Sequence, residues 1–406
     1  MTKAPRAIPR ALRGVTTLDD VLRLAKRRLP RMLFEYIDRG TERELALSAD
    51  RAAYDALRLL PSQLVDVSGR SAACLVLGRA QAMPVIVAPT EGVGLVWYRG
   101  EVELARAAAD SGIPFALATR SLASVETVVR EAGGDVWFQL YASTDIERSK
   151  ALLARATAAG VRVLVLTVDT PVPARRDYNV RNGFSIPFKP TVRALTDMVL
   201  HPRWLLGVIG QHMRNGGMPR LENLPERPLI TQGSPPAAML NGALTWEHVR
   251  ALRDLWPGAF VVKGLLTVDD ARQAVQVGAD AIVVSNHGAR NFDSAPSPLA
   301  VLPEIAGAVG RKIEVLVDGG IRHGSDIAKA LAFGARAVLV GRPTLYGTAV
   351  ADRDGAALVL AILREELLYT MAMLGRPTVA GIGPDVLHAS DGCARPASRL
   401  PAPDRD

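Results

Sequence analysis

Eight short apolar runs follow one another along this chain, most of them rich in β-branched residues. Each closes on a polar residue, a glycine or a proline, and alanine-rich stretches with helical periodicity separate most of them. Runs of this kind are typical of strands in a parallel sheet that is buried on both faces. Eight strand–helix units in succession predict an α/β fold, a (β/α)8 TIM barrel. The runs are Pro84–Pro89, Pro114–Thr119, Asp135–Tyr141, Arg162–Asp169, Ala259–Gly264, Ala281–Asn286, Glu314–Gly319 and Ala337–Arg342.

Helix start signals lie between these runs. Ser121 is expected to open a helix before Val125, and Thr267 to open another, because short hydroxyl side chains cap helix N-termini. Further helices are predicted around Leu18–Lys26, Met32–Ile37 and Trp246–Leu255, the last as the fourth barrel helix.

We expect one domain over residues 1–406, because the repeat has no break that separates two cores. Its predicted parts are an N-terminal helical segment (1–80), the barrel (84–375), an insertion after the fourth strand (178–240) and a tail (376–406). The insertion is rich in proline and glycine from Pro219 to Pro236, which predicts a mobile loop.

Composition narrows the function classes. With 49% apolar and 22% charged residues, the 406-residue chain can bury a substantial core. Its two cysteines, Cys74 and Cys393, form neither a disulfide framework nor a zinc set, so a reducing, cytoplasmic compartment is expected. The net charge of +8 is spread along the chain without a stripe of aromatic residues, which argues against nucleic-acid binding. No apolar run approaches the roughly 20 residues of a membrane span, and residues 1–13 do not resemble a secretory signal.

The last two strand ends predict a phosphate site. Asp318-Gly319-Gly320-Ile321-Arg322 precedes a helix, and Gly341-Arg342 closes the eighth run. Glycines let backbone N–H groups approach a phosphate, a helix N-terminus favours the anion, and two arginines neutralise it. The loops after strands seven and eight are the usual phosphate site of this barrel.

A second group of strand-end residues predicts acid–base chemistry. His287 follows the sixth run and is flanked by glycine, and a nearby Asp169 would let it act as a general base. Arg176 and Arg290 follow the same two strand ends and suit one planar carboxylate. Lys263 would place positive charge beside an electron-rich ring. The sequence predicts no metal site, since it lacks spaced histidine or cysteine ligands.

The segment Ser285-Asn286-His287-Gly288-Ala289-Arg290-Asn291-Phe292-Asp293 resembles the SNHGGRQLD signature of the FMN-dependent 2-hydroxy acid oxidases and dehydrogenases. This family includes glycolate oxidase, lactate oxidase, flavocytochrome b2 and (S)-mandelate dehydrogenase. Supporting matches run from about Leu18 to Leu387, and those at His201–Trp204 and Leu252–Pro257 are most similar to the mandelate dehydrogenase branch.

The resemblance implies a role for each matching residue. His287 would take the proton, with Asp169 as its partner. Arg176, Arg290 and Tyr36 would bind the substrate carboxylate, and Tyr141 the hydroxyl or carboxylate. FMN would be the cofactor. Its implied contacts are Pro89, Thr90, Gln139, Thr167, Lys263 and Ser285 at the ring system, and Asp318, Gly320, Arg322, Gly341 and Arg342 toward the phosphate.

Four residues depart from the family pattern. Glu91 replaces a small residue beside the flavin, Ala118 replaces a hydroxyl residue, and Ala289 replaces a glycine of the signature. Arg120 takes a pocket position that is aromatic or small in relatives. Glu91 and Arg120 are expected to form an ion pair; alternatively, Arg120 binds an extra polar or anionic group of the substrate.

The predicted function is FMN-dependent oxidation of an (S)-2-hydroxy acid, mandelate-like or otherwise bulky, with a quinone or another acceptor reoxidising the flavin. The alternatives are an oxidase that uses O2 and a flavoprotein that acts on a modified peptide. Residues 193–215 are largely apolar and either contact the cytoplasmic face of a membrane as a peripheral surface or form a lid over the site. The resemblance further implies a homotetramer.

Overall fold

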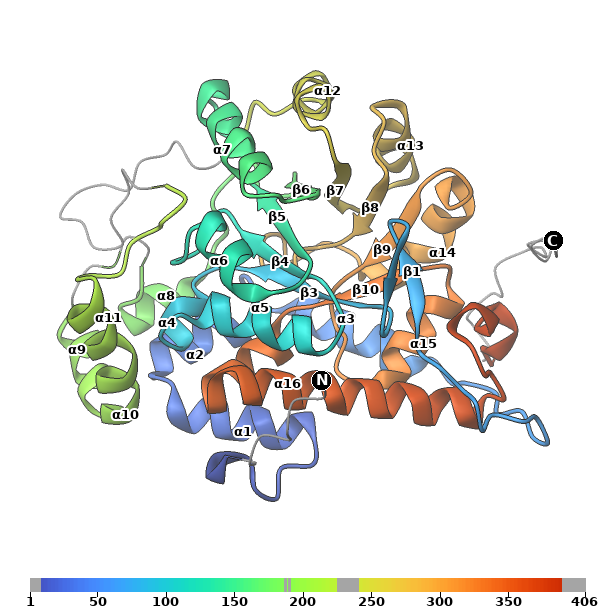
Figure 1. The fold of residues 1–406 in the computed structure, drawn as a ribbon, viewed down its shortest axis with the longest axis horizontal. Coiled ribbons are helices and arrows are strands. Elements are labelled where there is room, and N and C mark those ends of the chain that lie inside the picture. The colour runs from blue at the N-terminus through green and yellow to red at the C-terminus, as the bar shows by residue number, and fades with distance from the viewer. Residues whose placement is uncertain (1–8, 186–187, 189–190, 225–240, 389–406) are drawn as a thin grey trace.

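A closed barrel of eight parallel strands forms the centre of the molecule (Figure 1). The structure, a computed structural model, describes residues 9–185, 188, 191–224 and 241–388. The strands pair in chain order, and the last pairs with the first, so the predicted (β/α)8 barrel is confirmed. The barrel strands are β3 (Val85–Thr90), β4 (Phe115–Ala118), β5 (Val136–Leu140), β6 (Val163–Thr167), β7 (Ala259–Leu265), β8 (Ala281–Val284), β9 (Glu314–Val317) and β10 (Ala337–Val340).

Side chains on the two faces of the strands build two separate cores. Inward-facing residues such as Ile86, Trp137 and Val261 fill the barrel interior. Outward-facing residues such as Val87 and Phe138 join the larger core beneath the helices. Because neither face meets water, the strands carry continuous apolar runs instead of an alternating pattern.

Helices surround the barrel (Figure 1). Thr267 caps α13 by accepting a hydrogen bond from Asp270 N, as expected. The prediction for Ser121 is wrong, because Ser124 caps α6 and Ser121 instead donates its hydroxyl to Ala123 O. The helices are α4 (Val93–Val96), α5 (Gly100–Asp110), α6 (Val125–Ala132), α7 (Ile146–Ala158), α12 (Trp246–Leu255), α13 (Val268–Gln276), α14 (Pro298–Val309), α15 (Gly324–Ala332) and α16 (Arg342–Met373), the last kinked at Ala351 and Asp352.

The segment before the barrel places one helix at the site and a hairpin at the opposite end. The expected helices are α1 (Leu18–Arg28) and α2 (Arg31–Asp38), and a third helix, α3 (Leu45–Ala56), was not predicted. The hairpin of β1 (Cys74–Val76) and β2 (Arg79–Gln81) buries Val76 in the barrel-interior core. Leu77 N donates to Glu314 at the start of β9, so the hairpin covers the N-terminal mouth of the barrel. Short 3-10 turns lie at Arg10–Leu12, Val379–Gly381 and Pro384–Val386.

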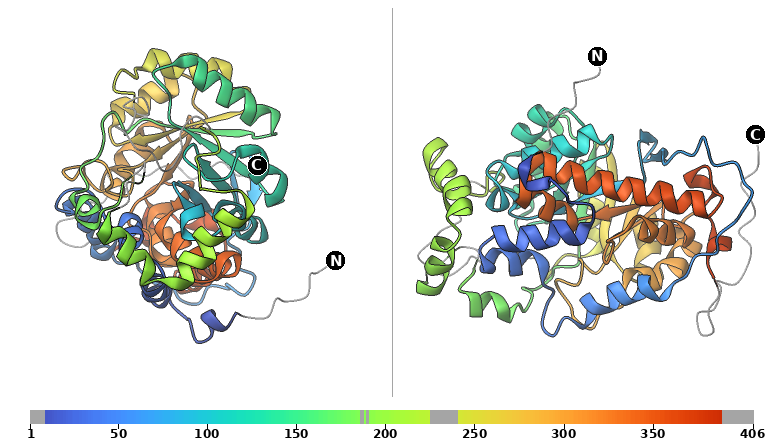
Figure 2. Two further views of the ribbon diagram at one scale, coloured as in Figure 1. Left: turned by 90° about the vertical axis from the view of Figure 1, so that its left-hand side faces the viewer. Right: turned by 90° about the horizontal axis from the view of Figure 1, so that it is seen from below.

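The described part of the insertion after β6 is mainly helical. It contains α8 (Asp177–Asn182), α9 (Val192–Val199), α10 (Pro202–Trp204), a π-helical stretch (Leu205–Ile209) and α11 (Gly210–Asn215). Most of these helices gather at one edge of the molecule, beside α1 and α2 (Figures 1 and 2). Most of the predicted Pro219–Pro236 loop lies outside the described residues.

Candidate active site

A cavity of about 920 Å³ opens at the C-terminal ends of the barrel strands. Residues from the strand ends, from α2 and from the start of the insertion line it. Three of the predicted residues, Asp169, Thr167 and Ser285, lie behind this lining. The predicted residues that line it are Tyr36, Pro89, Thr90, Arg120, Gln139, Tyr141, Arg176, Lys263, His287, Arg290, Asp318, Gly320, Arg322, Gly341 and Arg342.

His287 and Asp169 meet as predicted. His287 Nδ1 lies 2.8 Å from Asp169 Oδ1. Burial alone would raise the pKa of Asp169, but the charges of His287 and Lys263 outweigh burial and hold this pKa below its ordinary value. The carboxylate is therefore ionised and accepts the Nδ1 proton, which leaves Nε2 as the basic nitrogen. Nε2 lies 3.3 Å from the hydroxyl of Tyr141 in the cavity wall.

The turn that presents His287 has an unusual backbone. His287, Gly288 and Ala289 all have positive φ angles, of 62°, 63° and 59°. For a non-glycine residue the left-handed conformation costs roughly 1–2 kcal/mol, so surrounding contacts must hold this turn. His287 N donates to Ser285 Oγ, and Ala289 N donates to Asn286 Oδ1. Ala289, which replaces a glycine of the family signature, thus adopts the conformation that a glycine would favour.

Two arginines converge beside the ring of Tyr36. The guanidinium carbons of Arg290 and Arg176 lie 5.0 and 5.7 Å from the ring centre. Burial and the neighbouring charge of Arg290 lower the pKa of Arg176. Two partly buried cations beside one ring favour a bound anion. The structure thus brings together the two arginines that the sequence predicted to bind a carboxylate, and their role stays a prediction.

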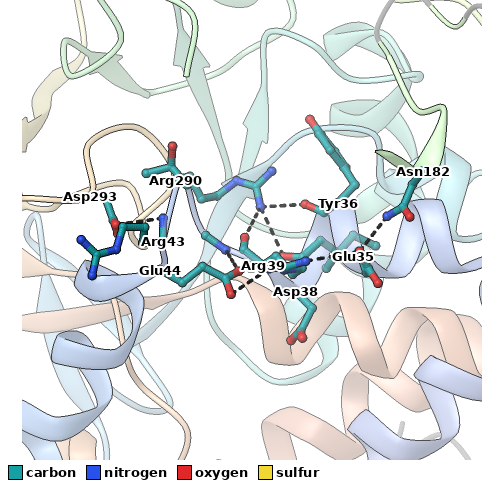
Figure 3. A network of polar contacts seen from close by, with 12 residues as sticks. Glu35, Tyr36, Asp38, Arg39, Arg43, Glu44, Asn182, Arg290 and Asp293 are labelled. Atoms are coloured by element: carbon teal, nitrogen blue, oxygen red, sulfur yellow. Dashed lines mark hydrogen bonds and ion pairs between the residues drawn. The ribbon is translucent and has the colours of Figure 1, made fainter. Parts of the chain in front are cut away.

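Arg290 and a third arginine, Arg342, also donate hydrogen bonds to carbonyl oxygens at the C-terminal end of α2. Arg290 Nη1 donates to the carbonyl oxygen of Tyr36 at 2.8 Å, with longer contacts to those of Ile37 and Arg39 (Figure 3). Arg342 donates to the carbonyls of Ile37, Arg39 and Gly288. The last carbonyls of a helix lack intrahelical partners, so both arginines satisfy groups that would otherwise need water.

Lys263 is held in a buried network. Its ammonium donates to Ser285 Oγ at 2.8 Å and pairs with Asp318 Oδ2 at 2.9 Å. Burial opposes its charge, but Asp318 and Asp169 outweigh burial and raise the pKa of Lys263. Lys263 therefore remains a fixed positive charge at the cavity wall. Ser285 acts through Lys263 and His287 instead of lining the cavity itself.

Glu91 and Arg120 form the expected ion pair. Glu91 Oε2 lies 3.2 Å from Arg120 Nη1, and both side chains are largely buried in the cavity wall. The guanidinium of Arg120 also lies 5.8 Å from the ring centre of Tyr141. The pair thus borders the same space as the His287–Asp169 couple.

The predicted phosphate end combines a glycine turn with arginines. Gly319 and Gly320 have φ angles of 90° and 74°, which L side chains rarely adopt. Burial, together with the charges of Arg290 and Arg322, lowers the pKa of Arg342 to about 10. An anion bound here would relieve that repulsion.

These residues fit an FMN group. Among the described residues, the buried polar atoms of the cavity lining that have no hydrogen-bond partner include Thr90 Oγ1, Gln139 Nε2 and Asp318 Oδ1. Gln139 is held by Thr119, whose backbone N–H donates to Gln139 Oε1, so its amide N–H groups remain to be used. The donors and acceptors at the strand ends and the charge of Lys263 suit a polar ring system. The glycine turn and its neighbouring arginines suit a phosphate group.

Some residues that shape the site were not singled out from the sequence. A Cβ at Gly264 would lie 2.6 Å from Asp169 Cβ, so glycine is required for the carboxylate to sit beside the strand. Asn291 donates to the carbonyl of Asp169 at 2.9 Å. Asn291 lies within the family signature, and Gly264 follows Lys263 at the end of the fifth run. Both positions were therefore visible in the sequence, but the contacts that require these residues depend on neighbouring segments.

The family described as FMN-dependent dehydrogenase matches residues 25–389. (S)-Mandelate dehydrogenase of Pseudomonas putida is 40% identical over 373 residues, which cover 91% of this chain and 93% of that protein. L-Lactate oxidase of Nostoc sp. is 40% identical over 387 residues, covering 93% of this chain and 99% of that protein.

Solved structures show the same similarity. The structure of the monotopic membrane protein (S)-mandelate dehydrogenase superposes with a TM-score of 0.85 at 38% identity, covering 93% of this chain and all of that one. Mandelate oxidase with benzoyl-formic acid superposes with a TM-score of 0.77 at 35% identity, covering 92% of this chain and 98% of that one.

Proposed function

The chain belongs to the family of FMN-dependent dehydrogenases, and we propose that it oxidises an (S)-2-hydroxy monocarboxylic acid with a bulky, mandelate-like side chain to the 2-oxo acid. The observation that carries this proposal is the His287–Asp169 couple at a cavity that also holds two arginines beside Tyr36. This set provides a base for the proton and a cationic clamp for the carboxylate.

Each residue acts on a defined part of the substrate. Arg176 and Arg290 bind the carboxylate, and Tyr36 lies beside both of them. Tyr141, whose hydroxyl is 3.3 Å from His287 Nε2, orients the hydroxyl carbon against the base. His287 Nε2 accepts the proton that the substrate releases, and Asp169 stabilises the resulting imidazolium.

FMN is the cofactor of this family and, when bound, accepts the two electrons that leave the substrate. Pro89, Thr90, Gln139 and Lys263 would hold its ring from the cavity wall, with Thr167 and Ser285 behind them. Asp318, Gly320, Arg322, Gly341 and Arg342 would hold its chain and phosphate. The fixed charge of Lys263 favours negative charge in its neighbourhood.

The charge and shape of the cavity support a monocarboxylic acid with a bulky side chain. Glu91 offsets the charge of Arg120, so Arg176 and Arg290 remain for one carboxylate. Val172, Val180 and Phe184 add apolar surface at the side where Tyr36 contacts Phe184, with 4.7 Å between ring centres. An aromatic or branched side chain would bury against this wall.

Anaerobic flavin bleaching tests this function. We expect (S)-mandelate and its ring-hydroxylated forms to bleach the visible absorption band of the bound flavin under anaerobic conditions, with all of the bound FMN reduced. His287→Asn should retain FMN and lose bleaching by a factor of about 10³ or more, since the base is absent. If no 2-hydroxy acid of an aliphatic and aromatic panel bleaches bound FMN, the proposal is wrong.

For the electron acceptor, we favour a quinone or another molecule over O2. The exposed apolar residues of α9–α11 adjoin α2, whose Tyr36 lines the cavity, and this arrangement suits an acceptor dissolved in a membrane. Substrate-reduced enzyme mixed with air-saturated buffer should stay reduced for seconds but be reoxidised quickly by a soluble quinone. Rapid reoxidation in air with release of H2O2 would establish the alternative, an oxidase like the related L-lactate oxidase.

We further propose that α9 to α11 form a peripheral membrane-contact surface on the cytoplasmic side. Trp204 Nε1 and His212 Nε2 contact the carbonyls of Leu95 and Gly94, which anchors the segment on α4. Its outer side exposes Val199, Leu200 and Leu206 by 66–72%. None of the helices in the described part of the chain is long and apolar enough to cross a bilayer. An anchored segment with outward apolar side chains suits insertion into a membrane surface better than movement as a lid.

Vesicle sedimentation tests the membrane contact. The double variant Leu200→Ser/Leu206→Ser should lower the partition onto vesicles of phosphatidylcholine and phosphatidylglycerol by about tenfold or more, because two apolar side chains leave the bilayer. Leu75→Ser/Leu255→Ser is the matched control, since both residues are exposed on other elements. Equal sedimentation of all three proteins would show that this segment does not bind the membrane.

A further inference from the structure

Helix α3 lies beneath both turns that build the active site. A Cβ at Gly320 would come within 2.7 Å of Asp50 O, so the backbone of α3 touches the Gly319–Gly320 turn. Arg51 Nη1 donates to Gly320 O at 2.7 Å. The buried stripe of this helix consists of Ala46, Asp50 and Tyr54. An acid in the middle of an apolar stripe is unusual, and burying it needs compensating contacts.

Asp50 is fully buried and contacts the turn that carries His287. Its Oδ1 accepts a hydrogen bond of 2.7 Å from Asn286 Nδ2. The amide oxygen of Asn286 in turn accepts from Ala289 N at 3.0 Å. Asp50 is therefore one hydrogen bond away from the left-handed 287–289 turn.

The second oxygen of Asp50 faces the glycine turn. A Cβ at Gly319 would lie 3.2 Å from Asp50 Oδ2 and 3.4 Å from Asn286 Oδ1. Within the described residues Oδ2 has no hydrogen-bond partner. One carboxyl group thus joins the catalytic turn and the turn at the phosphate end of the cavity.

We propose that Asp50 is a positioning residue, which fixes Asn286 and thereby holds the His287 turn in register with the Gly319–Gly320 turn. The inference rests on the proposed function, because it assigns Asp50 to the same reaction. Without this contact the side-chain N–H groups of Asn286 keep only a long contact of 3.4 Å to Pro296 O among the described residues. The strained 287–289 turn would then lose one of the contacts that determine it.

The surroundings of Asp50 make this role depend on pH. Burial and the negative charge of Asp318 raise the pKa of Asp50 to about 7, although the hydrogen bond from Asn286 and the charge of Arg342 act in the opposite direction. Two other titratable or charged groups near Asp50 lie on the same helix: Tyr54, and Arg51, which pairs with Asp55 and Asp326. A third is Lys263, which pairs with Asp318. Below neutral pH Asp50 is the neutral acid, and above it a negative charge arises under the glycine turn. That charge would repel a bound phosphate.

Two substitutions separate positioning from charge. Asp50→Asn keeps an oxygen that can accept from Asn286 and cannot ionise, whereas Asp50→Ala removes the acceptor. We expect Asp50→Ala to lower kcat by about ten- to a hundredfold with little change in KM, and Asp50→Asn to restore most of it at pH 6. Asp55→Ala, on the exposed side of the same helix, is the control and should match the wild type.

FMN release provides a readout without turnover. The fluorescence of released FMN should show that the Kd of the wild type rises from pH 6 to pH 8.5 more steeply than that of Asp50→Asn. Because the pKa of Asp50 is raised from 3.8 to about 7 in the folded state, the wild type loses stability as pH rises between these two values, so the Tm advantage of Asp50→Asn should grow up to about pH 7 and then stay constant. The inference would be overturned if Asp50→Ala kept the kcat of the wild type. It would also be overturned if the Kd of FMN changed with pH in the same way in the wild type and in Asp50→Asn. If no 2-hydroxy acid bleaches the FMN of the wild type, the proposed function is refuted instead. The pH dependence of FMN binding would still test the role of Asp50, because it needs no turnover.

Discussion

At the scale of single residues, the site is defined by charges held close together in a buried space. The Lys263–Asp318 and Glu91–Arg120 pairs each place opposite charges within 3.2 Å, and the Asp169 carboxylate lies 2.8 Å from Nδ1 of His287. Arg176 and Arg290 stand apart from this pattern, because burial and the like charge of Arg290 lower the pKa of Arg176. In the proposed reaction, the substrate carboxylate would supply the negative charge that compensates this arginine pair.

Replacing Glu91 by Gln is expected to shift the preference toward 2-hydroxy dicarboxylates. The amide keeps the shape of the side chain but removes the negative charge that faces Arg120. A second substrate carboxylate would then compensate that charge, so the ratio of kcat/KM for (S)-malate to that for (S)-lactate should rise about tenfold or more. Glu131→Gln, which alters a pair with Arg99 outside the cavity lining, should leave the ratio unchanged. A constant ratio in Glu91→Gln would count against Glu91 as a determinant of specificity.

Replacing Asp169 by Asn should lower the rate of flavin reduction by about a hundredfold or more. The lowered pKa of Asp169 keeps this group charged through the neutral range, and the amide can neither stabilise an imidazolium nor fix the Nδ1 proton. Stopped-flow absorbance measures the rate, and the visible spectrum and Tm report intact FMN binding and folding. A rate within about threefold of the wild type would exclude Asp169 as the partner of the base.

At the scale of elements, α2 links the cavity to the insertion. Asp197 of α9 accepts hydrogen bonds from Arg31 N and Met32 N and so caps the N-terminus of α2. Arg290 donates to carbonyls at its C-terminal end (Figure 3), and so does Arg342. Asn182 of α8 donates to Glu35 on the same helix. The helix that carries Tyr36 is thus fixed at both ends by distant segments.

Asp197→Ala is expected to weaken substrate binding as well as stability. Loss of a helix cap costs about 1 kcal/mol, and here it also loosens the helix that carries Tyr36. The Kd of a 2-oxo acid, measured from perturbation of the flavin spectrum, should rise several-fold. Thr17→Ala removes the cap of α1, where Thr17 accepts from Asp20 N, and should lower Tm similarly without changing this Kd. Equal Kd values in both variants would place α2 outside substrate binding.

At the scale of the whole molecule, apolar surface is exposed in a second region besides α9–α11. Ser62 N donates to Met373 O, which brings the exposed Leu64 and Val65 near the end of α16. Tyr369 is exposed one turn before Met373. Large exposed apolar patches mark interaction sites, so this region is a candidate contact between subunits.

Light scattering coupled to gel filtration tests the implied homotetramer. The holoenzyme should elute with a mass close to four times 43.4 kDa. The double variant Tyr369→Ser/Met373→Ser should shift the distribution toward smaller species, because it removes apolar area from the contact. A wild-type mass of one chain would contradict the tetramer.

Much of the fold and of the site followed from the strand pattern. All eight barrel strands, α1, α2 and α12 lie where they were expected, within a few residues. The residues at the strand ends converge because parallel strands of one barrel end on the same side. Helix α3 and the β1–β2 hairpin were missed, since neither has the apolar repeat that identified the barrel.

The sequence by itself determined the barrel and the chemical types at its rim, because strands buried on both faces require continuous apolar runs whose ends mark the site. Only the tertiary structure decided how those residues are held. Asp50 meets Asn286, Asp197 caps α2, and Arg342 reaches the carbonyl of Ile37 across long stretches of chain. These contacts are hydrogen bonds between segments that are distant in the chain. The sequence shows which donors and acceptors are present, but only the folded structure decides which of them pair.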